Sequence, residues 1–296
     1  MTRMQLVVIG NGMAGMRTVE ELLQLAPDKY DITVIGREPH GNYNRIMLSP
    51  VLAGEKAFED IVIHPLSWYA ERGITLLAGH TVTGVDRVQR CVSTDQGVVV
   101  RYDRLLLATG SVPFMIPMPG HDHPDVISFR DIADVRRMLA PSATPPRVVV
   151  LGGGLLGLEA ANGLVKQGMA VTVVNDAAYL LNRQLDEEAS SLLRAALEAK
   201  GIAFKVSAVT SHISHNADTG KLNALHFKDG TELSCDLLVM AVGVRPNVAL
   251  ARSIGLQVDK AILVNDTMQT FDPRIYAVGE GVQHRGALFG LVAPLY

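Results

Sequence analysis

The sequence contains the same glycine-rich turn twice. Residues 4–18 read MQLVVIGNGMAGMRT, and residues 147–163 read RVVVLGGGLLGLEAANG. In both stretches an apolar strand runs into Gly-x-Gly-x-x-Gly, and apolar residues then recur at three- and four-residue steps, which predicts a helix. Each predicted helix leads to a second apolar strand, over 30–36 and 170–175. This order predicts an α/β protein with parallel sheets and helical crossovers.

The repeat extends beyond the two turns. Residues 102–113 (YDRLLLATGSVP) match residues 235–246 (CDLLVMAVGVRP), because in both an Asp precedes an apolar strand that ends in Ala-x-Gly. A stretch rich in turn residues precedes each of these strands and predicts a hairpin. The repeated unit is about 90 to 100 residues long and occurs twice, which predicts two similar domains and not a solenoid.

Glycines at this spacing are typical of dinucleotide-binding turns. The first glycine permits the sharp turn, the second lets a pyrophosphate approach the backbone, and the third lets the helix pack on the strand. The helix N-terminus offers free N–H groups and partial positive charge to the pyrophosphate. A single such turn is weak evidence. Two copies with matching strands favour two Rossmann-like domains. The candidate binding residues are Gly10, Gly12, Met13, Ala14, Gly15, Ala108, Thr109 and Gly110 in the first copy, and Gly152, Gly154, Leu155, Leu156, Gly157, Val242 and Gly243 in the second.

An acidic residue after the second strand commonly binds the ribose hydroxyls. In the first copy we interpret Glu38 in this way, the alternative being an exposed loop glutamate. In the second copy Asn175 takes the corresponding place and Asp176 follows. A neutral residue there removes repulsion against a 2′-phosphate, whereas Asp176 restores it. The pattern favours NADH, with NADPH as the alternative.

Composition excludes several other classes of function. The net charge is −3 and no Lys/Arg block occurs, which argues against nucleic acid or an anionic membrane as partner. The longest apolar runs fall short of the ~20 residues of a spanning helix, and the first strand begins too early for a signal peptide, so we expect a cytoplasmic protein. Cys91 and Cys235 form no Cys-x-x-Cys, so no redox dithiol or Fe–S cluster is expected within this chain. We interpret His121 and His123 as surface loop residues and predict no metal site.

Two dinucleotide turns in one chain resemble the two-domain flavin and pyridine-nucleotide oxidoreductases. In that family the NAD(P) domain is inserted into the FAD domain, and the closing FAD segment resembles residues 264–283. The two turns, residues 37–55 and residues 288–294 are similar to the flavin module of NAD(P)H-dependent nitrite reductase large subunits and of assimilatory nitrate reductase electron-transfer subunits. Rubredoxin and ferredoxin reductases are near relatives. The resemblance implies a discontinuous FAD-binding domain (1–116 plus 245–296) and an NAD(P)H-binding domain (117–244).

The same resemblance implies roles for individual residues. Glu38, Pro39 and Arg45 would approach the adenosine–pyrophosphate side of FAD, and the backbone of Val82 would face the adenine. Glu280 would lie near the ribityl–phosphate arm. Glu159 would lie near the nicotinamide. The sequence departs from the family pattern at three positions: Pro50, where many relatives have Lys, Gly281, where Cys is usual in nitrite reductases, and Glu280, where Asp is usual.

The function implied is hydride transfer from NAD(P)H to FAD, followed by electron transfer to an Fe–S or sirohaem domain or subunit of a nitrite reductase. No Ser-His-Asp arrangement or carboxylate pair is needed, because the flavin does the chemistry. The alternatives are a rubredoxin- or ferredoxin-type reductase and, in a different class, a binding protein that senses nucleotide occupancy. We expect the C-terminal interface domain of the relatives to be absent, leaving apolar surface around Leu288–Leu295 uncovered. The oligomeric state stays open.

Overall fold

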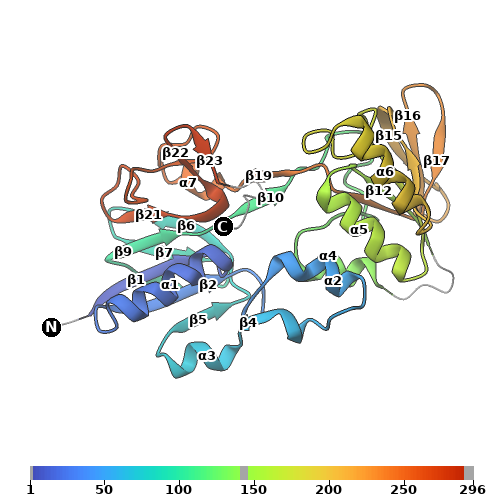
Figure 1. Ribbon diagram of the computed structural model, residues 1–296. Helices are drawn as coiled ribbons and strands as arrows, with labels where there is room; N and C mark the ends of the chain where they lie inside the picture. Colours follow the sequence, from blue (N-terminus) through green and yellow to red (C-terminus); the bar gives the residue numbers. More distant parts are fainter. Residues whose placement is uncertain (1–2, 141–145, 290–296) are drawn as a thin grey trace. The chain divides into compact units, whose positions relative to one another are not determined.

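The computed structural model describes residues 3–140 and 146–289 (Figure 1). The chain forms two compact units. The first comprises Met1–Asn44, Val62–Val112 and Arg245–Tyr296, and the second comprises Arg45–Ile61 and Pro113–Val244. Each unit is built around a five-stranded parallel sheet.

The sheet of the first unit has the strand order β21-β9-β1-β2-β5. Its strands are β1 (Met4–Ile9), β2 (Tyr30–Gly36), β5 (Thr75–Ala78), β9 (Arg104–Leu107) and β21 (Ile275–Ala277). Helix α1 (Met13–Leu25) crosses one face of this sheet (Figure 1). Its residues Met16 and Val19 share an apolar core with Leu6 and Val8 of β1. Strand β21 pairs with β9, so the C-terminal segment completes the sheet that the N-terminus begins.

Smaller elements surround this sheet. They are the antiparallel strands β6 (Val82–Asp86), β7 (Cys91–Thr94) and β8 (Val99–Arg101), the pair β3 (Asn42–Tyr43) and β4 (Val62–His64), the strands β20 (Ile262–Leu263), β22 (Val282–His284) and β23 (Ala287–Leu288), and the helices α3 (Leu66–Glu71) and α7 (Ala249–Ser253). A single apolar core joins β1 and β9 to the β6-β7-β8 hairpin sheet and to α7.

The sheet of the second unit has the equivalent order, β11-β18-β12-β13-β14. Its strands are β11 (Val126–Ser128), β12 (Arg147–Leu151), β13 (Ala170–Val174), β14 (Ala203–Lys205) and β18 (Leu237–Met240). The remaining elements are α2 (Leu48–Leu52), α4 (Ile132–Met138), α5 (Leu155–Lys166), α6 (Glu187–Glu198) and the antiparallel sheet of β15 (Thr210–His215), β16 (Leu222–Phe227) and β17 (Glu232–Ser234). The prediction of an α/β protein with two Rossmann-like domains is confirmed. Among the described residues, no helix is long and apolar enough to cross a membrane.

The Asp that precedes each Ala-x-Gly strand has a structural role. The Asp103 carboxylate accepts a hydrogen bond from the backbone N–H of Gln5 (2.8 Å), and Asp236 accepts one from the N–H of Arg147 (2.8 Å). The backbone N–H groups of Asp103 and Asp236 in turn donate to the carbonyls of Gln5 and Arg147. Each Asp therefore fixes the start of its strand against the central strand of the sheet.

The segment Arg45–Ile61 is grouped with a different unit from the domain that the sequence implied. The resemblance implied that it belongs to the first domain, whereas its contacts place it in the second unit. The reason is packing: α2 contacts α4 and α5 and buries Leu48 and Leu52. The other crossings between the units, at 112/113 and 244/245, fall within β10 (Ser111–Pro113) and β19 (Val244–Pro246).

Candidate functional site

The first glycine turn is shaped by its contact with the Ala108 strand end. Gly10 has φ +113°, and a Cβ there would lie 2.1 Å from the Ala108 carbonyl oxygen. A Cβ on Gly15 would lie 2.8 Å from Ala108 Cβ. Both positions therefore require glycine for packing. Gly12 does not, because a Cβ there would meet nothing within 4 Å.

The second turn repeats this geometry around Ala241. Gly152 has φ +124°, and a Cβ there would lie 2.5 Å from the Ala241 carbonyl oxygen. A Cβ on Gly157 would lie 2.0 Å from the Gly152 carbonyl oxygen, whereas one on Gly154 would meet nothing within 4 Å. In both turns the fold explains the outer glycines but not the middle one. The middle glycine faces open space, as close approach of a pyrophosphate requires.

The helices that follow the two turns have free N-termini. Gly12 and Gly154 are the N-cap residues of α1 and α5, neither of which has a side-chain cap or an acidic residue in its first turn. In contrast, α4 and α6 are capped by the carboxylates of Asp131 and Asp186. The uncapped N–H groups of α1 and α5 are available to an anion. The predicted residues Met13, Ala14, Leu155 and Leu156 lie in these first turns. Both turns therefore fit a dinucleotide pyrophosphate.

Glu38 is held in place beside the first turn. Its side chain is 18% exposed, and the Tyr43 hydroxyl donates a hydrogen bond to Oε2 (2.8 Å). The interpretation as an exposed loop glutamate therefore does not describe this residue. Pro39 lies next to it, 3.8 Å from the position of a Cβ on Gly79. Val82 begins β6 of the same unit.

A polar network that was not predicted from the sequence holds the first turn at Asn11. The Tyr69 hydroxyl donates to Asn11 Oδ1 (2.7 Å), and Asn42 Nδ2 donates to the Asn11 carbonyl (2.9 Å). Burial raises the pKa of Tyr69, so the phenol stays protonated as the donor. The signal in the sequence was the Asn between the first two glycines, since an amide there can bond to neighbouring backbone.

The closing segment of the first unit meets the Ala108–Gly110 strand end. Thr109 Oγ1 donates to the Asn247 carbonyl (2.9 Å), and Ser111 Oγ donates to Glu280 Oε2 (2.6 Å). Glu280 is thereby brought to the strand end from 169 positions away. Ser111 and Asn247 were not identified from the sequence.

The Asn175 side chain makes hydrogen bonds that the sequence does not indicate. Its side chain is buried, its Oδ1 accepts from the Gly153 N–H (3.1 Å), and its Nδ2 donates to the carbonyls of Ala177 (3.3 Å) and Tyr179 (3.1 Å). The amide is committed to the glycine turn. Asp176, the next residue, is exposed.

Strand register shows that the two acid positions are not equivalent. Leu151 pairs with Val174, and Ile9 pairs with Ile35. Ile35 and Val174 are therefore equivalent, and so are the next residues, Gly36 and Asn175. Glu38 lies two positions after Gly36, so Asn175 is not its equivalent. Alignment of the two second strands by their ends, VIG-REP with VVN-DAA, would have shown this offset.

Glu159 and Arg45 both lie in the second unit. Glu159 is on α5, and the Ser49 hydroxyl donates to its Oε2 (2.6 Å). The Arg45 guanidinium donates to the Arg130 carbonyl (3.2 Å), and Arg45 is in the segment that joins the second unit, whereas the resemblance implied a place in the first domain. At the predicted Val242–Gly243 strand end, the Gly243 carbonyl accepts from the Phe114 N–H (2.9 Å).

Other candidate groups have ordinary structural roles. The His121 and His123 rings bond to the carbonyls of Met118 and Gly220. Within residues 3–140 and 146–289, no three His, Cys, Asp or Glu side chains form a metal-binding group. Burial raises the pKa of the Cys235 thiol to about 12. Leu288 and Phe289 are exposed, and the rest of the predicted apolar patch lies outside the described residues.

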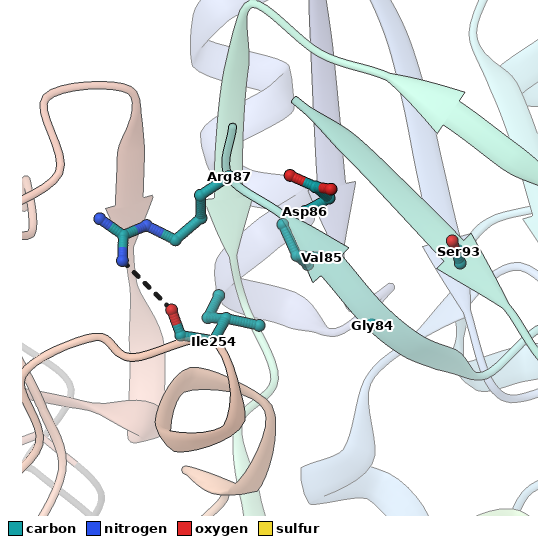
Figure 2. Close-up of a pocket in the computed structure, with 6 residues that line it drawn as sticks. All are labelled: Gly84, Val85, Asp86, Arg87, Ser93 and Ile254. Carbon is teal, nitrogen blue, oxygen red and sulfur yellow. Dashed lines mark hydrogen bonds between the residues drawn. The ribbon is translucent and has the colours of Figure 1, made fainter. Parts of the chain in front are cut away.

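The hollow in Figure 2 lies on the first unit and is lined by none of the glycine-turn residues. It is formed by Gly84, Val85, Asp86, Arg87, Ser93 and Ile254. Arg87 is engaged there, since its Nη1 donates to the Ile254 carbonyl (3.2 Å) and its Nε to Asp272 (2.9 Å). The hollow therefore gives no reason to place a cofactor there.

The family is decided by the match of residues 4–289 to the pyridine nucleotide-disulphide oxidoreductase model. The chain belongs to this family. The oxidoreductase is 49% identical over its whole length to nitrite reductase [NAD(P)H] of Bacillus subtilis and 47% identical to the assimilatory nitrate reductase electron transfer subunit of the same organism. It spans 36% and 38% of the length of these relatives.

A solved structure agrees with the family. The crystal structure of a covalent putidaredoxin reductase–putidaredoxin complex superposes with a TM-score of 0.86 at 30% identity, covering 96% of this chain and 69% of that one. Membership confirms the predicted resemblance, the NAD(P)H-dependent flavoprotein class of this oxidoreductase, and FAD and NAD(P)H as its cofactors.

Proposed function

We propose that the first unit binds FAD, the second binds NAD(P)H, and the chain oxidises the nicotinamide nucleotide to supply electrons to a separate acceptor. The observation that carries this proposal is the pair of open middle glycines, each at an uncapped helix N-terminus. FAD, when bound, accepts a hydride from the reduced nicotinamide and releases electrons to the next carrier. The protein binds and orients the two nucleotides.

In the first unit, Gly12 and the N-terminus of α1 hold the pyrophosphate of FAD. Glu38, fixed by Tyr43, binds the adenosine ribose, and Glu280, fixed by Ser111, lies toward the ribityl–phosphate arm. The assignment of FAD to this unit is supported by the sequence similarity of its closing segment to that of the flavin domains. The assignment of Arg45 to FAD rests on the family resemblance, and the residue belongs to the segment grouped with the second unit.

In the second unit, Gly154 and the N-terminus of α5 hold the pyrophosphate of the nicotinamide nucleotide, and Glu159 lies toward the nicotinamide. Asp176 is exposed where a carboxylate favours ribose hydroxyls and repels a 2′-phosphate. We therefore infer a preference for NADH over NADPH.

The acceptor that we propose is an Fe–S or sirohaem domain or subunit of a nitrite reductase. The two Bacillus subtilis relatives, which are named for nitrite and nitrate reduction, support this choice. The alternative acceptor is a ferredoxin- or rubredoxin-type protein, which the similarity to putidaredoxin reductase in complex with putidaredoxin supports. A cytoplasmic location stays a prediction from composition.

Steady-state oxidation of NADH by the FAD-reconstituted protein, with an artificial one-electron acceptor, tests the proposal. We expect continuous turnover that depends on added FAD, and no nitrite consumption by the chain alone. Stoichiometric nucleotide binding without turnover would instead support the nucleotide-sensing alternative. Nitrite consumption by the purified chain would contradict the need for a separate acceptor.

A further inference from the structure

The carboxylate of Glu159 is held by a single hydroxyl group. Ser49 Oγ donates to Glu159 Oε2 across 2.6 Å, although the two residues are 110 positions apart. This length is typical of a charge-assisted bond from a hydroxyl group to an ionised carboxylate. Among the described residues, no other hydrogen bond is made to the Glu159 side chain, so Oε1 is left to accept one.

Ser49 lies at one end of a row of contacts between its segment and α5. The Leu52 side chain packs on Gly163, where a Cβ would lie 2.9 Å from Leu52 Cγ. Further along, Gln167 Nε2 donates to the Leu52 carbonyl (3.1 Å), and Lys166 forms an ion pair with Glu55.

These contacts recur every three to four residues on both segments. Positions 49, 52 and 55 meet positions 159, 163 and 166 in the same order. Residues spaced in this way lie on one face of α5, and their partners are Ser49 and Leu52 of α2 and Glu55, which follows α2. The Ser49–Glu159 bond is therefore the first contact of a continuous interface and not an isolated surface pair.

We propose that Ser49 is a positioning residue for the nicotinamide end of the second site, an inference that rests on the proposed function. By binding Oε2, it fixes the Glu159 side chain so that Oε1 accepts a hydrogen bond from the carboxamide NH₂ of the nicotinamide. The next residue, Pro50, has no hydrogen-bond donor.

The test compares NAD⁺ with ADP-ribose, which lacks the nicotinamide, by calorimetry on the full chain. A hydrogen bond to a charged group contributes about 1.5–3 kcal/mol. Ser49→Ala releases the Glu159 carboxylate; because the hydrogen bond then lost is the one from the carboxamide to Glu159, NAD⁺ binding should weaken by about tenfold. Affinity for ADP-ribose should stay within about twofold of the unsubstituted protein, since the pyrophosphate cradle is untouched. Ser49→Thr keeps the hydroxyl group and should bind NAD⁺ with the affinity of the unsubstituted protein.

Two further variants separate positioning from packing. In a double-mutant cycle, Ser49→Ala should have no added effect on NAD⁺ affinity once Glu159 is replaced by Ala. Lys166→Gln removes an exposed ion pair at the far end of the same interface and should leave both affinities unchanged.

Three results would overturn the inference. Unchanged NAD⁺ affinity in Ser49→Ala would show that the hydroxyl group has no role in binding the nicotinamide. Equal weakening of NAD⁺ and ADP-ribose would show a purely structural role. If the unsubstituted protein bound no NAD⁺, the proposed function would be wrong and the inference with it.

Discussion

Replacement of Gly154 by Ala should separate nucleotide binding from folding. The backbone there has φ −82° and ψ 177°, which any residue adopts, and a Cβ would meet nothing within 4 Å. The folding cost is then the loss of a favourable N-cap residue, up to about 1 kcal/mol. This corresponds to a fall in Tm of about 2–4 °C for a domain of this size.

The effect on binding should be larger. A methyl group beside the N-terminus of α5 occupies the space through which a pyrophosphate reaches the backbone N–H groups. Loss of one hydrogen bond to a charged oxygen costs about 1.5–3 kcal/mol, so NAD⁺ should bind about 10- to 100-fold more weakly. Calorimetry with NAD⁺ measures this change, and flavin absorbance should show that FAD content is unchanged.

Two other glycines provide the controls. Gly84 also has an ordinary φ and open space around its Cβ, but it lies in β6, so Gly84→Ala should leave NAD⁺ affinity unaltered. Gly152→Ala places a Cβ 2.5 Å from the Ala241 carbonyl oxygen at φ +124° and should destabilise the fold by about 2–5 kcal/mol. Wild-type NAD⁺ affinity in a folded Gly154→Ala variant would refute the reasoning.

Further outcomes are expected at other positions. Gly12→Val should give a folded, colourless protein that still binds NAD⁺; a yellow, fully flavinylated variant would show that FAD binds elsewhere. Asp176→Ala should reduce the ratio of the flavin reduction rates with NADH and NADPH. If NADPH reduced the unsubstituted protein at least about tenfold faster than NADH, a difference of about 1.4 kcal/mol, the preference for NADH would be wrong. Because the Cys235 pKa is raised to about 12, its thiolate fraction at pH 8 is roughly one in 10⁴, so alkylation followed by mass spectrometry should modify it only after unfolding. A hydrogen bond from the Arg147 side chain lowers the pKa of Asp236. The resulting stabilisation is present above the carboxyl pKa of the unfolded chain and is lost as pH falls through the lower pKa of the folded protein. Asp236→Asn should therefore flatten the acid limb of the stability–pH curve, and an unchanged limb would count against this pair.

Local patterns were sufficient to predict the sheets and both glycine turns. The strands of the repeat could be matched by their alternation with helices and by the recurring Ala-x-Gly. The outer glycines follow from backbone geometry alone, because a turn from strand to helix at that spacing needs close approach to the neighbouring strand. These features are short-range, and they recur in both halves of the chain.

The parts that could not be predicted depend on contacts between distant segments. Nothing near Ser49 in the sequence indicates that it meets Glu159, because that contact arises only when α2 packs on α5 through Leu52 and Gly163. The same packing moves Arg45–Ile61 into the second unit. The hydrogen bonds of Asn175 could not be predicted for a related reason, because the direction of its side chain depends on the carbonyls of the following loop.

The central claim is that one chain holds FAD and NADH so that a hydride passes between them. Anaerobic stopped-flow mixing of the FAD-loaded protein with NADH tests it most directly, because the loss of flavin absorbance follows the transfer itself. The account predicts bleaching of all bound flavin at a rate that saturates with NADH, and slower bleaching at the same NADH concentration in Gly154→Ala. Flavin that stays oxidised in the presence of bound NADH would contradict it.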